Sequence, residues 1–217
     1  MLMKRRDHIL LVSLDLFNRE GETNLTAVDI ANELEISPGN LYYHFKGKEE
    51  LVTELYEQFE AGIETLLQDS RSADASLEEH WLYLYVMLEH IFNYRFFFRN
   101  TTDLLHKYGG IDKRFGKLVE KQYQWIHQLL DSLLEEGLLA DRTMIASRID
   151  QLADNIMLIF THRFQFQNLR KKSLDQHQFI QGAILQIMAL LAPYLGEQQL
   201  QFMETCTELS LREKQCQ

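Results

Sequence analysis

Residues 26–51 read TAVDIANELEISPGNLYYHFKGKEEL and carry the signals of two short helices joined by a tight turn. Thr26 stands three residues before an aspartate, a variant of the capping box that begins a helix. Ser37 followed by Pro38 begins the next helix, because serine caps a helix and proline suits its first position. The small residue Ala31 lies where the two helices must pack closely. This stretch therefore predicts a helix-turn-helix.

The second of these helices is suited to the DNA major groove. Its first turn consists of small and polar residues, so its backbone can approach DNA closely, and the N-terminal residues of such a helix face base edges. Tyr43 and His44 follow on the exposed face and can reach phosphates or bases, whereas Tyr42 fits either a phosphate contact or packing. Leu41 and Phe45 share a face with neighbouring apolar residues and are predicted to be core.

The charges around this motif limit how it can bind a nucleic acid. The first fifty residues contain six Lys and Arg against nine Asp and Glu, a net charge of −3, within a chain of net charge −10. Phosphate binding needs local positive charge, so DNA contacts must depend on where single cations and helix N-termini lie. Lys48 begins the next predicted helix, where its ammonium group and the exposed backbone N–H groups both favour a phosphate.

Apolar spacing predicts that the whole chain is helical. Only two residues are proline, so long helices can run without interruption. Ser76 and Ser173 each begin a capping box, with Glu79 and Gln176 as their partners. We predict an all-α protein of about nine helices, with a three-helix head at residues 1–50 and a larger helical body at residues 51–217. The predicted helices cover residues 9–17, 26–34, 37–45, 51–69, 77–98, 100–108, 112–136, 141–169 and 173–194.

Residues 6–51 resemble the DNA-binding head of the TetR family of one-component regulators. The matching segments are residues 9–17 with Gly21, residues 26–31, and residues 36–45 followed by residues 48–51. The chain length and the helix layout also fit this family. The resemblance implies a homodimer that binds a palindromic operator, usually as a repressor, and that releases it when a ligand enters the helical body.

The resemblance also assigns the residues that touch DNA. Two positions depart from the family's pattern. Glu35 stands where the turn commonly has glycine, so we expect it to take a left-handed backbone at some energetic cost. Val28 replaces the longer base-reading side chain of some members, which leaves the operator sequence open. Carried over position by position, the DNA contacts are Thr26, Ala27, Val28, Ser37, Gly39, Asn40, Tyr42, Tyr43, His44 and Lys48.

The helical body carries more large rings than helix packing requires. Cavities lined by aromatic residues and a few polar groups are the usual small-molecule sites. We predict a largely apolar pocket between the helices that begin at residues 77, 112 and 141, for a hydrophobic or weakly polar effector and not a polyphosphate. A solid core without a cavity is the alternative. The predicted lining residues are Trp81, Tyr85, Phe92, Phe96, Tyr123, Trp125, Met157, Phe160, His162 and Phe164, with Tyr123 and His162 as polar contacts.

The helices predicted at 141–169 and 173–194 are apolar nearly all round. Such helices need cover on two sides. One side can face the core and the other can pack on the same pair of a second subunit, which makes a four-helix seam. Burial of both sides within one subunit is the alternative. The predicted interface residues are Ile149, Leu152, Ile156, Ile180, Ile184, Ile187 and Leu191.

Other classes of protein fit the sequence less well. It contains no Glu-x-x-His pair, Gly-rich phosphate loop, nucleophile elbow or Cys-His cluster, so we predict no enzyme, no metal site and no cofactor. A helical adaptor that works through protein contacts is the alternative, although it does not account for a polar, glycine-containing probe helix between basic residues. Two cysteines near the C-terminus and the lack of a bilayer-length apolar run predict a cytoplasmic protein without membrane contact.

Overall fold

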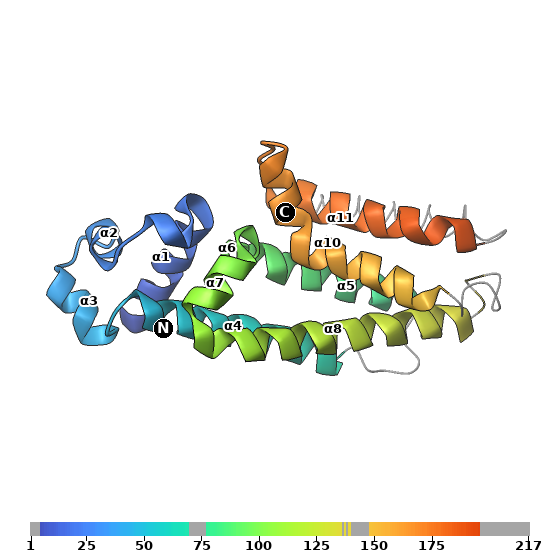
Figure 1. Ribbon diagram of the computed structural model, residues 1–217, viewed down its shortest axis with the longest axis horizontal. Coiled ribbons are helices and arrows are strands. Elements are labelled where there is room, and N and C mark those ends of the chain that lie inside the picture. Colours follow the sequence, from blue (N-terminus) through green and yellow to red (C-terminus); the bar gives the residue numbers. More distant parts are fainter. Residues whose placement is uncertain (1–4, 70–76, 136, 138, 140–147, 196–217) are drawn as a thin grey trace. The chain divides into compact units, whose positions relative to one another are not determined.

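The structure, a computed structural model, describes residues 5–69, 77–135, 137, 139 and 148–195. Every regular element in these residues is a helix, which confirms the predicted all-α class (Figure 1). The α-helices are α1 (Arg5–Glu20), α2 (Ala27–Glu33), α3 (Pro38–His44), α4 (Lys48–Asp69), α5 (Leu77–Asn93), α6 (Phe96–Arg99), α7 (Thr101–Lys107), α8 (Gly109–Glu135), α10 (Ile149–Leu169) and α11 (Gln176–Leu191), with short 3-10 helices η1 (Glu22–Asn24) and η2 (Ala192–Tyr194).

The chain forms two compact units. The first comprises Met1–Gly62 and Asn93–Gly116, and the second comprises Ile63–Phe92 and Lys117–Gln217. The first unit therefore contains α6 and α7 in addition to the helix-turn-helix. The predicted division at residue 50 separates a DNA-binding function from a regulatory one, and it stays a prediction, because compactness does not test function.

The helix-turn-helix forms as its local signals predict. Thr26 caps α2: its hydroxyl accepts a hydrogen bond from the Asp29 N–H at 3.3 Å, and the Asp29 carboxylate accepts one from the Thr26 N–H at 2.8 Å. Ser37 caps α3 by accepting from the Asn40 N–H at 3.2 Å, with Pro38 in the first turn. Each cap satisfies backbone N–H groups that have no partner within their helix. The predicted starts of both helices are confirmed.

The turn between α2 and α3 passes through Glu35. Its φ of 53° lies in the left-handed region, as predicted for this position. The Glu35 N–H donates to the Asn32 carbonyl and the Ile36 N–H donates to the Ala31 carbonyl, both at 3.0 Å. A left-handed residue other than glycine costs about 1–2 kcal/mol. These hydrogen bonds and the complete burial of Ala31 offset that cost.

Helix α6 is attached to α1 in the first unit. Phe17 of α1 packs against Phe96 of α6 with ring centres 5.3 Å apart. The Asn18 side chain donates to the Asn93 carbonyl at 2.7 Å and accepts from the Phe96 N–H at 3.1 Å. The amide of Asn18 thus satisfies two backbone groups at the entrance to α6, which fixes α6 by polar as well as apolar contacts.

The second unit is organised around α10 and α11, which pack against each other. Phe164 of α10 stacks on Phe179 of α11 with ring centres 4.0 Å apart. Phe92 of α5 lies 5.7 Å and 5.5 Å from these two rings. The three rings fill the space between their helices. None of the described helices is both long enough and apolar enough to cross a membrane.

The predicted start of α11 is wrong. Ser173 was the expected N-cap, but α11 begins at Gln176 and its N-cap is Asp175. The Asp175 carboxylate accepts from the Gln178 N–H at 2.8 Å, and the Gln178 side chain accepts from the Asp175 N–H at 3.3 Å. Both Ser173 and Asp175 have the spacing of a capping box, and an ionised carboxylate is the stronger acceptor.

Other predicted boundaries differ from those observed. The helix predicted over 77–98 is two helices, α5 and α6, separated by a turn at residues 94–95. Helix α8 begins at Gly109, so its two glycines form the first turn of the helix and do not precede it. The capping box at Ser76 and the first part of the helix predicted over 141–169 lie outside the described residues, in which α10 begins at Ile149.

Candidate nucleic-acid interface

Most of the residues predicted to touch DNA lie on the exposed surface of α2 and α3. Tyr43 is 86% exposed, and the neighbouring Tyr42 is half exposed. Leu41 and Phe45 are buried and hold α3 on the core, as predicted. The exposed members of the predicted set are Thr26, Val28, Ser37, Gly39, Asn40, Tyr42 and Tyr43, and the half-buried members are Ala27, His44 and Lys48.

The first turn of α3 is open to an approaching DNA backbone. A Cβ atom placed on Gly39 would have the Ser37 hydroxyl, 3.9 Å away, as its nearest neighbour. Further along the helix, the rings of Tyr43 and His44 meet edge to face with centres 5.2 Å apart. This surface offers an amide for base edges at Asn40, hydroxyl groups for phosphates, and rings for apolar contact with thymine methyl groups.

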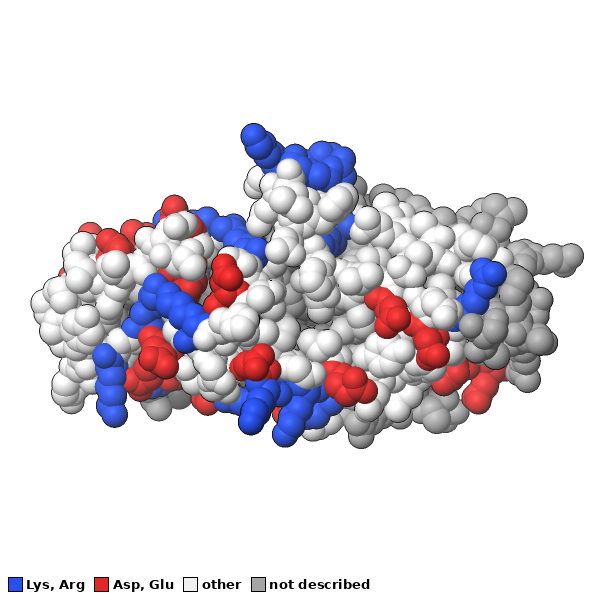
Figure 2. Space-filling model, viewed as in Figure 1, with Lys and Arg blue, Asp and Glu red and all other residues white. Residues whose placement is uncertain are grey.

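Most cations near the helix-turn-helix are paired with carboxylates of the same chain. The surface over α3, at the far left of Figure 2, carries few charged side chains, whereas acidic side chains lie along the upper left edge, over α2. Within the described residues the Lys46 ammonium makes no ion pair, which leaves it available for a phosphate. The paired cations are Arg6 with Glu50 and Glu54, Arg19 with Asp15, Glu20 and Glu33, and Lys48 with Glu22.

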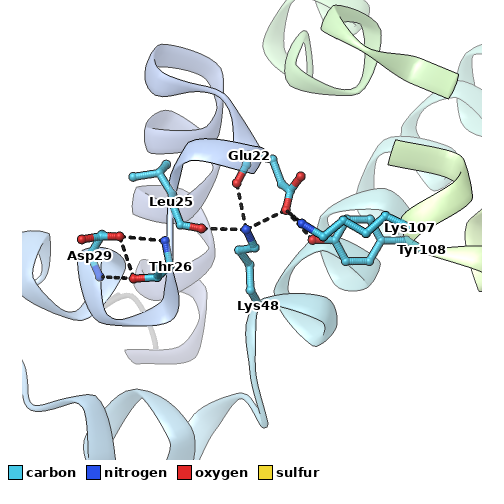
Figure 3. A network of polar contacts seen from close by, with 7 residues as sticks. All are labelled: Glu22, Leu25, Thr26, Asp29, Lys48, Lys107 and Tyr108. Atoms are coloured by element: carbon cyan, nitrogen blue, oxygen red, sulfur yellow. Dashed lines mark hydrogen bonds and ion pairs between the residues drawn. The ribbon is translucent and has the colours of Figure 1, made fainter. Parts of the chain in front are cut away.

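Lys48 differs from the other predicted DNA contacts, because its ammonium group points into the protein (Figure 3). It donates to the carbonyl oxygens of Leu25 at 2.6 Å and Glu22 at 2.9 Å. It also forms an ion pair with the Glu22 carboxylate at 2.8 Å, and only 18% of its side chain is exposed. The assignment of Lys48 to a phosphate stays a prediction, and the structure gives its ammonium three acceptors within the chain.

The Glu22 carboxylate is the centre of this polar cluster. Only 3% of its side chain is exposed. The same carboxylate oxygen that pairs with Lys48 also pairs with the Lys107 ammonium at 2.8 Å and accepts a short hydrogen bond from the Tyr108 hydroxyl (Figure 3). Sequence reasoning missed Glu22, Lys107 and Tyr108, since no local pattern connects residues 85 positions apart.

Burial and hydrogen bonding act in opposite directions on the Glu22 carboxyl. Burial alone would raise its pKa, but the hydrogen bonds from Lys107, Lys48 and Tyr108 hold the pKa below its ordinary value. Burial and the bond to Glu22 raise the pKa of the Tyr108 hydroxyl far above its ordinary value. Near neutral pH the carboxyl is therefore ionised and the phenol is a donor.

The ten residues predicted to line one ligand pocket lie at several different places in the described part of the chain. Trp81 lines an enclosed apolar cavity of about 40 Å³. Trp125 lines a polar hollow of about 270 Å³ elsewhere in the second unit, and His162 lines an open groove of about 420 Å³ on α10 and α11. Phe96 belongs to the first unit. The assignment of all ten residues to one lining stays a prediction.

The other residues predicted to line the pocket pack against neighbouring side chains. Large rings fill space most efficiently against one another, so a high ring content does not by itself indicate a cavity. In the second unit Phe92 and Phe164 pack on Phe179, Tyr85 stacks on Trp81 with ring centres 5.4 Å apart, Met157 and Phe160 are buried in the core, and Tyr123 lies beside His127.

The residues predicted to form a dimer seam face the interior of their own chain. None of them is more than 8% exposed, and several line the cavity beside Trp81. Burial in their own subunit leaves these residues little surface for a second subunit, and their assignment to a dimer seam stays a prediction. They are Ile149, Leu152, Ile156, Ile180, Ile184, Ile187 and Leu191.

Another face of α10 and α11 exposes apolar side chains. Leu158 and Leu185 are each 56% exposed, and Phe166 is half exposed. Leu158 and Phe166 line the groove of about 420 Å³, together with polar residues that include Asn155 and Gln186. The apolar character of both helices on two sides is therefore confirmed, but the side that faces solvent is not the one predicted.

Arg163 lies in this groove with an incomplete set of partners. It is 7% exposed, it donates to the Gln186 side chain, and its Nε atom has no hydrogen-bond partner in the described residues. Its guanidinium lies 5.2 Å from the centre of the Phe179 ring, and burial lowers its pKa. A Cβ atom at Gly182 would collide with the guanidinium, so the glycine makes room for it.

Comparisons with known proteins connect both parts of the chain to regulators of transcription. Residues 9–55 match the domain described as bacterial regulatory proteins of the tetR family, and residues 58–202 match the TetR domain described as a bacterial transcriptional repressor. Over 185 residues the chain is 28% identical to the HTH-type transcriptional regulator QacR of Staphylococcus aureus, which covers 82% of this chain and 96% of that protein.

Two further relatives extend this finding. Over 58 residues the chain is 38% identical to the HTH-type transcriptional regulator AcrR of Shigella flexneri, with 27% of each protein covered. The crystal structure of a TetR-family transcriptional regulator from Marinobacter aquaeolei VT8 matches with a TM-score of 0.83 and 28% identity, covering 95% of this chain and 99% of that one.

Proposed function

This chain belongs to the TetR family of bacterial transcriptional regulators, and we propose that it is a repressor that binds a palindromic operator as a homodimer and responds to a small effector. The observation that carries the proposal is the preformed helix-turn-helix, in which α3 exposes Asn40, Tyr42 and Tyr43 above a buried apolar face. In a two-fold dimer the two α3 helices would lie about 34–36 Å apart, or a multiple of it, to enter successive major grooves.

Selection from a random-sequence DNA pool, followed by footprinting, tests this function. We expect an inverted repeat whose half-sites are centred one helical turn apart or a multiple of it. Binding should weaken steeply as salt rises, because phosphate contacts release counterions. A purified protein that is monomeric and retains no duplex at low salt would refute the proposal.

Asn40 is proposed to read a base edge, because its exposed amide lies in the first turn of α3. Asn40→Ala should reduce discrimination at particular base pairs, by about 1–3 kcal/mol for each pair that is read. Asn32→Ala, an exposed asparagine of α2 outside the proposed contact set, is the matched control. Equal specificity profiles for Asn40→Ala and wild type would remove Asn40 from the set.

The exposed apolar face of α10 and α11 is proposed as the dimer surface. Isologous packing of this face on a second copy would remove Leu158 and Leu185 from water, which favours association. Leu158→Glu or Leu185→Glu should shift the protein to monomer in sedimentation experiments. Leu82→Glu, at a similarly exposed leucine of α5, should leave the assembly unchanged. A dimer that tolerates both α10 and α11 variants must use another surface.

The effector is proposed to enter beside Trp81. The cavity there is apolar but holds only about 40 Å³, whereas ligand sites occupy roughly 300–1,000 Å³, so binding requires the surrounding helices to separate. The Trp81 Nε1–H is buried without an acceptor in the described residues, which favours an apolar effector with one acceptor group. Thermal shifts in a screen of such compounds should shrink in Trp81→Phe. Shifts that persist in this variant would place the effector elsewhere.

A further inference from the structure

We propose that Glu22 is a positioning residue for the DNA-binding helices, and that Lys107 and Tyr108, which lie outside residues 1–50, set the DNA affinity by holding the Glu22 carboxylate. This inference rests on the proposed function, because it concerns how the helix-turn-helix is held for DNA. All the groups involved lie in the first compact unit (Figure 3).

The Lys48 side chain connects the start of α2 to the start of α4. The Lys48 ammonium, at the start of α4, donates to the carbonyl oxygens of Glu22 and Leu25. Leu25 directly precedes Thr26, the N-cap of α2. The entry into the first helix of the helix-turn-helix is therefore hydrogen bonded to the start of α4 through one ammonium group.

The end of α7 contacts the same junction through the Glu22 carboxylate. Lys107 is the last residue of α7 and Tyr108 is its C-cap. Both donate to the oxygen of Glu22 that also pairs with Lys48. Glu22 and Tyr108 are buried, and charge-assisted bonds in a buried site are stronger than in water, whereas the Lys107 side chain is 47% exposed. Removing one donor allows the carboxylate to move, and that movement reaches α2 through Lys48.

The charge of Lys48 is already compensated within its own chain. An ammonium group has three N–H donors, and Lys48 faces three acceptor oxygens of its own chain. The first turn of α4 also contains Glu49 and Glu50, and the Glu50 carboxylate accepts from the Lys46 N–H at 2.7 Å. A phosphate would have to displace Glu22 and approach two further carboxylates. Lys48 thus acts through the position of α2 and not by binding a phosphate.

Removing a single hydroxyl tests the role of α7. The probe is the duplex obtained by selection from a random-sequence pool, and the full-length protein is titrated into it. Tyr108→Phe should weaken binding by about tenfold, because it removes one hydrogen bond to the Glu22 carboxylate. Tyr194→Phe, which removes only a 3.5 Å bond from Arg148 in the second unit, is the matched control and should bind as wild type does.

The salt dependence tests the role of Lys48. Lys48→Met should weaken binding while the slope of log affinity against log salt stays that of wild type. If the Lys48 of each subunit bound a phosphate, the variant would instead lower the magnitude of the slope by about 1.8 for the proposed homodimer, which is about 0.9 for each phosphate. A lowered slope, or wild-type affinity in both Lys48→Met and Tyr108→Phe, would overturn the inference.

Amide hydrogen exchange tests the positioning without DNA. In Tyr108→Phe and Glu22→Gln, the N–H groups of Ile30 and Leu34 in and after α2 should exchange faster, while those of α10 and α11 stay protected. Unchanged exchange in α2 in both variants would overturn the inference. If wild type retains no duplex, the proposed function fails, and the exchange result still decides whether Glu22 positions α2.

Discussion

Of the charged side chains in the described residues, only Glu22 and Arg163 are buried, one in each compact unit. Glu22 meets two ammonium groups and a phenol hydroxyl of its own unit. Arg163 meets a neutral amide and the face of the Phe179 ring, and its Nε has no hydrogen-bond partner in the described residues. The two units thus compensate a buried charge to very different degrees.

This difference indicates what each charge does for its unit. Breaking a completely paired buried charge is costly, because its partners then remain buried without compensation. A buried charge with incomplete partners lowers stability, and replacing it with an apolar side chain is often neutral or favourable. Glu22 therefore stabilises the first unit within one chain, whereas Arg163 lies in the groove that we propose a second copy covers.

Of the two buried charges, Glu22 should have the larger effect on stability. Glu22→Leu leaves the mostly buried ammonium of Lys48 facing an apolar side chain, whereas Lys107 is 47% exposed and can turn to water, so the free energy of unfolding should fall by about 3 kcal/mol. Urea denaturation of the full-length protein measures this change. Glu20→Leu, at an exposed glutamate two residues earlier, should change it by less than about 0.5 kcal/mol. Similar decreases in both variants would show that the buried pairing of Glu22 does not account for the lost stability.

Replacing the other buried charge should have the opposite sign or no effect. Arg163→Met keeps most of the side-chain volume and removes an incompletely paired charge, so the free energy of unfolding should stay constant or rise by about 1 kcal/mol. Arg170→Met, at an exposed arginine that also lies over a ring, is the control. A decrease of several kcal/mol in Arg163→Met would mean that the partners of Arg163 are complete.

The pH dependence of stability should distinguish the two charges further. The pKa of the Glu22 carboxyl is lowered from its ordinary 4.5, so the unfolded chain binds a proton more readily than the folded chain. The stability from Glu22 is therefore fully present above about pH 5 and is lost as the pH falls through the folded pKa, by about 1.4 kcal/mol for each unit of difference. Unfolding measured from pH 7 to 3 should show this loss.

The matched variants complete the pH experiment. Glu22→Gln should remove the acid-dependent loss that Glu22 contributes, since an amide does not titrate. Arg163→Met should keep it, because an arginine stays charged throughout this range. Identical acid profiles for Glu22→Gln and wild type would contradict the lowered pKa of Glu22.

The smallest effect on stability is expected at the exposed face of α3. Tyr43→Ala should change the free energy of unfolding by less than about 0.5 kcal/mol, because the ring is almost entirely in solvent. The same variant should lose affinity for the selected duplex. Phe45→Ala, two residues further and buried, should cost about 3–5 kcal/mol. A large stability decrease in Tyr43→Ala would show that this ring serves the fold instead of the interface.

The helix-turn-helix could be predicted from the sequence because its signals act over a few residues. The caps at Thr26 and Ser37 lie within three residues of their partners. The left-handed turn at Glu35 and the buried positions Leu41 and Phe45 follow from the same short stretch. Each of these features depends on backbone geometry that neighbouring side chains determine.

The face of α10 and α11 that turns inward could not be predicted in the same way. An apolar stripe on one side of a helix indicates which side is buried, but α10 and α11 are apolar on two sides. Their sequence therefore fits either orientation. Packing against the rest of the second unit selected the side with Ile156 and Ile184 for the interior and left Leu158 and Leu185 in solvent.

The sequence by itself determined the helical class, the caps and turn of the DNA-binding motif, and the residues exposed on α3. Only the tertiary structure decided the partners of Lys48, which lie 23 and 26 residues away, and brought Lys107 to the same carboxylate across 85 residues. It also decided which face of α10 is buried and left Arg163 without a carboxylate in the described residues. The physical reason is that burial and charge pairing depend on what lies nearby in space, which a local pattern does not contain.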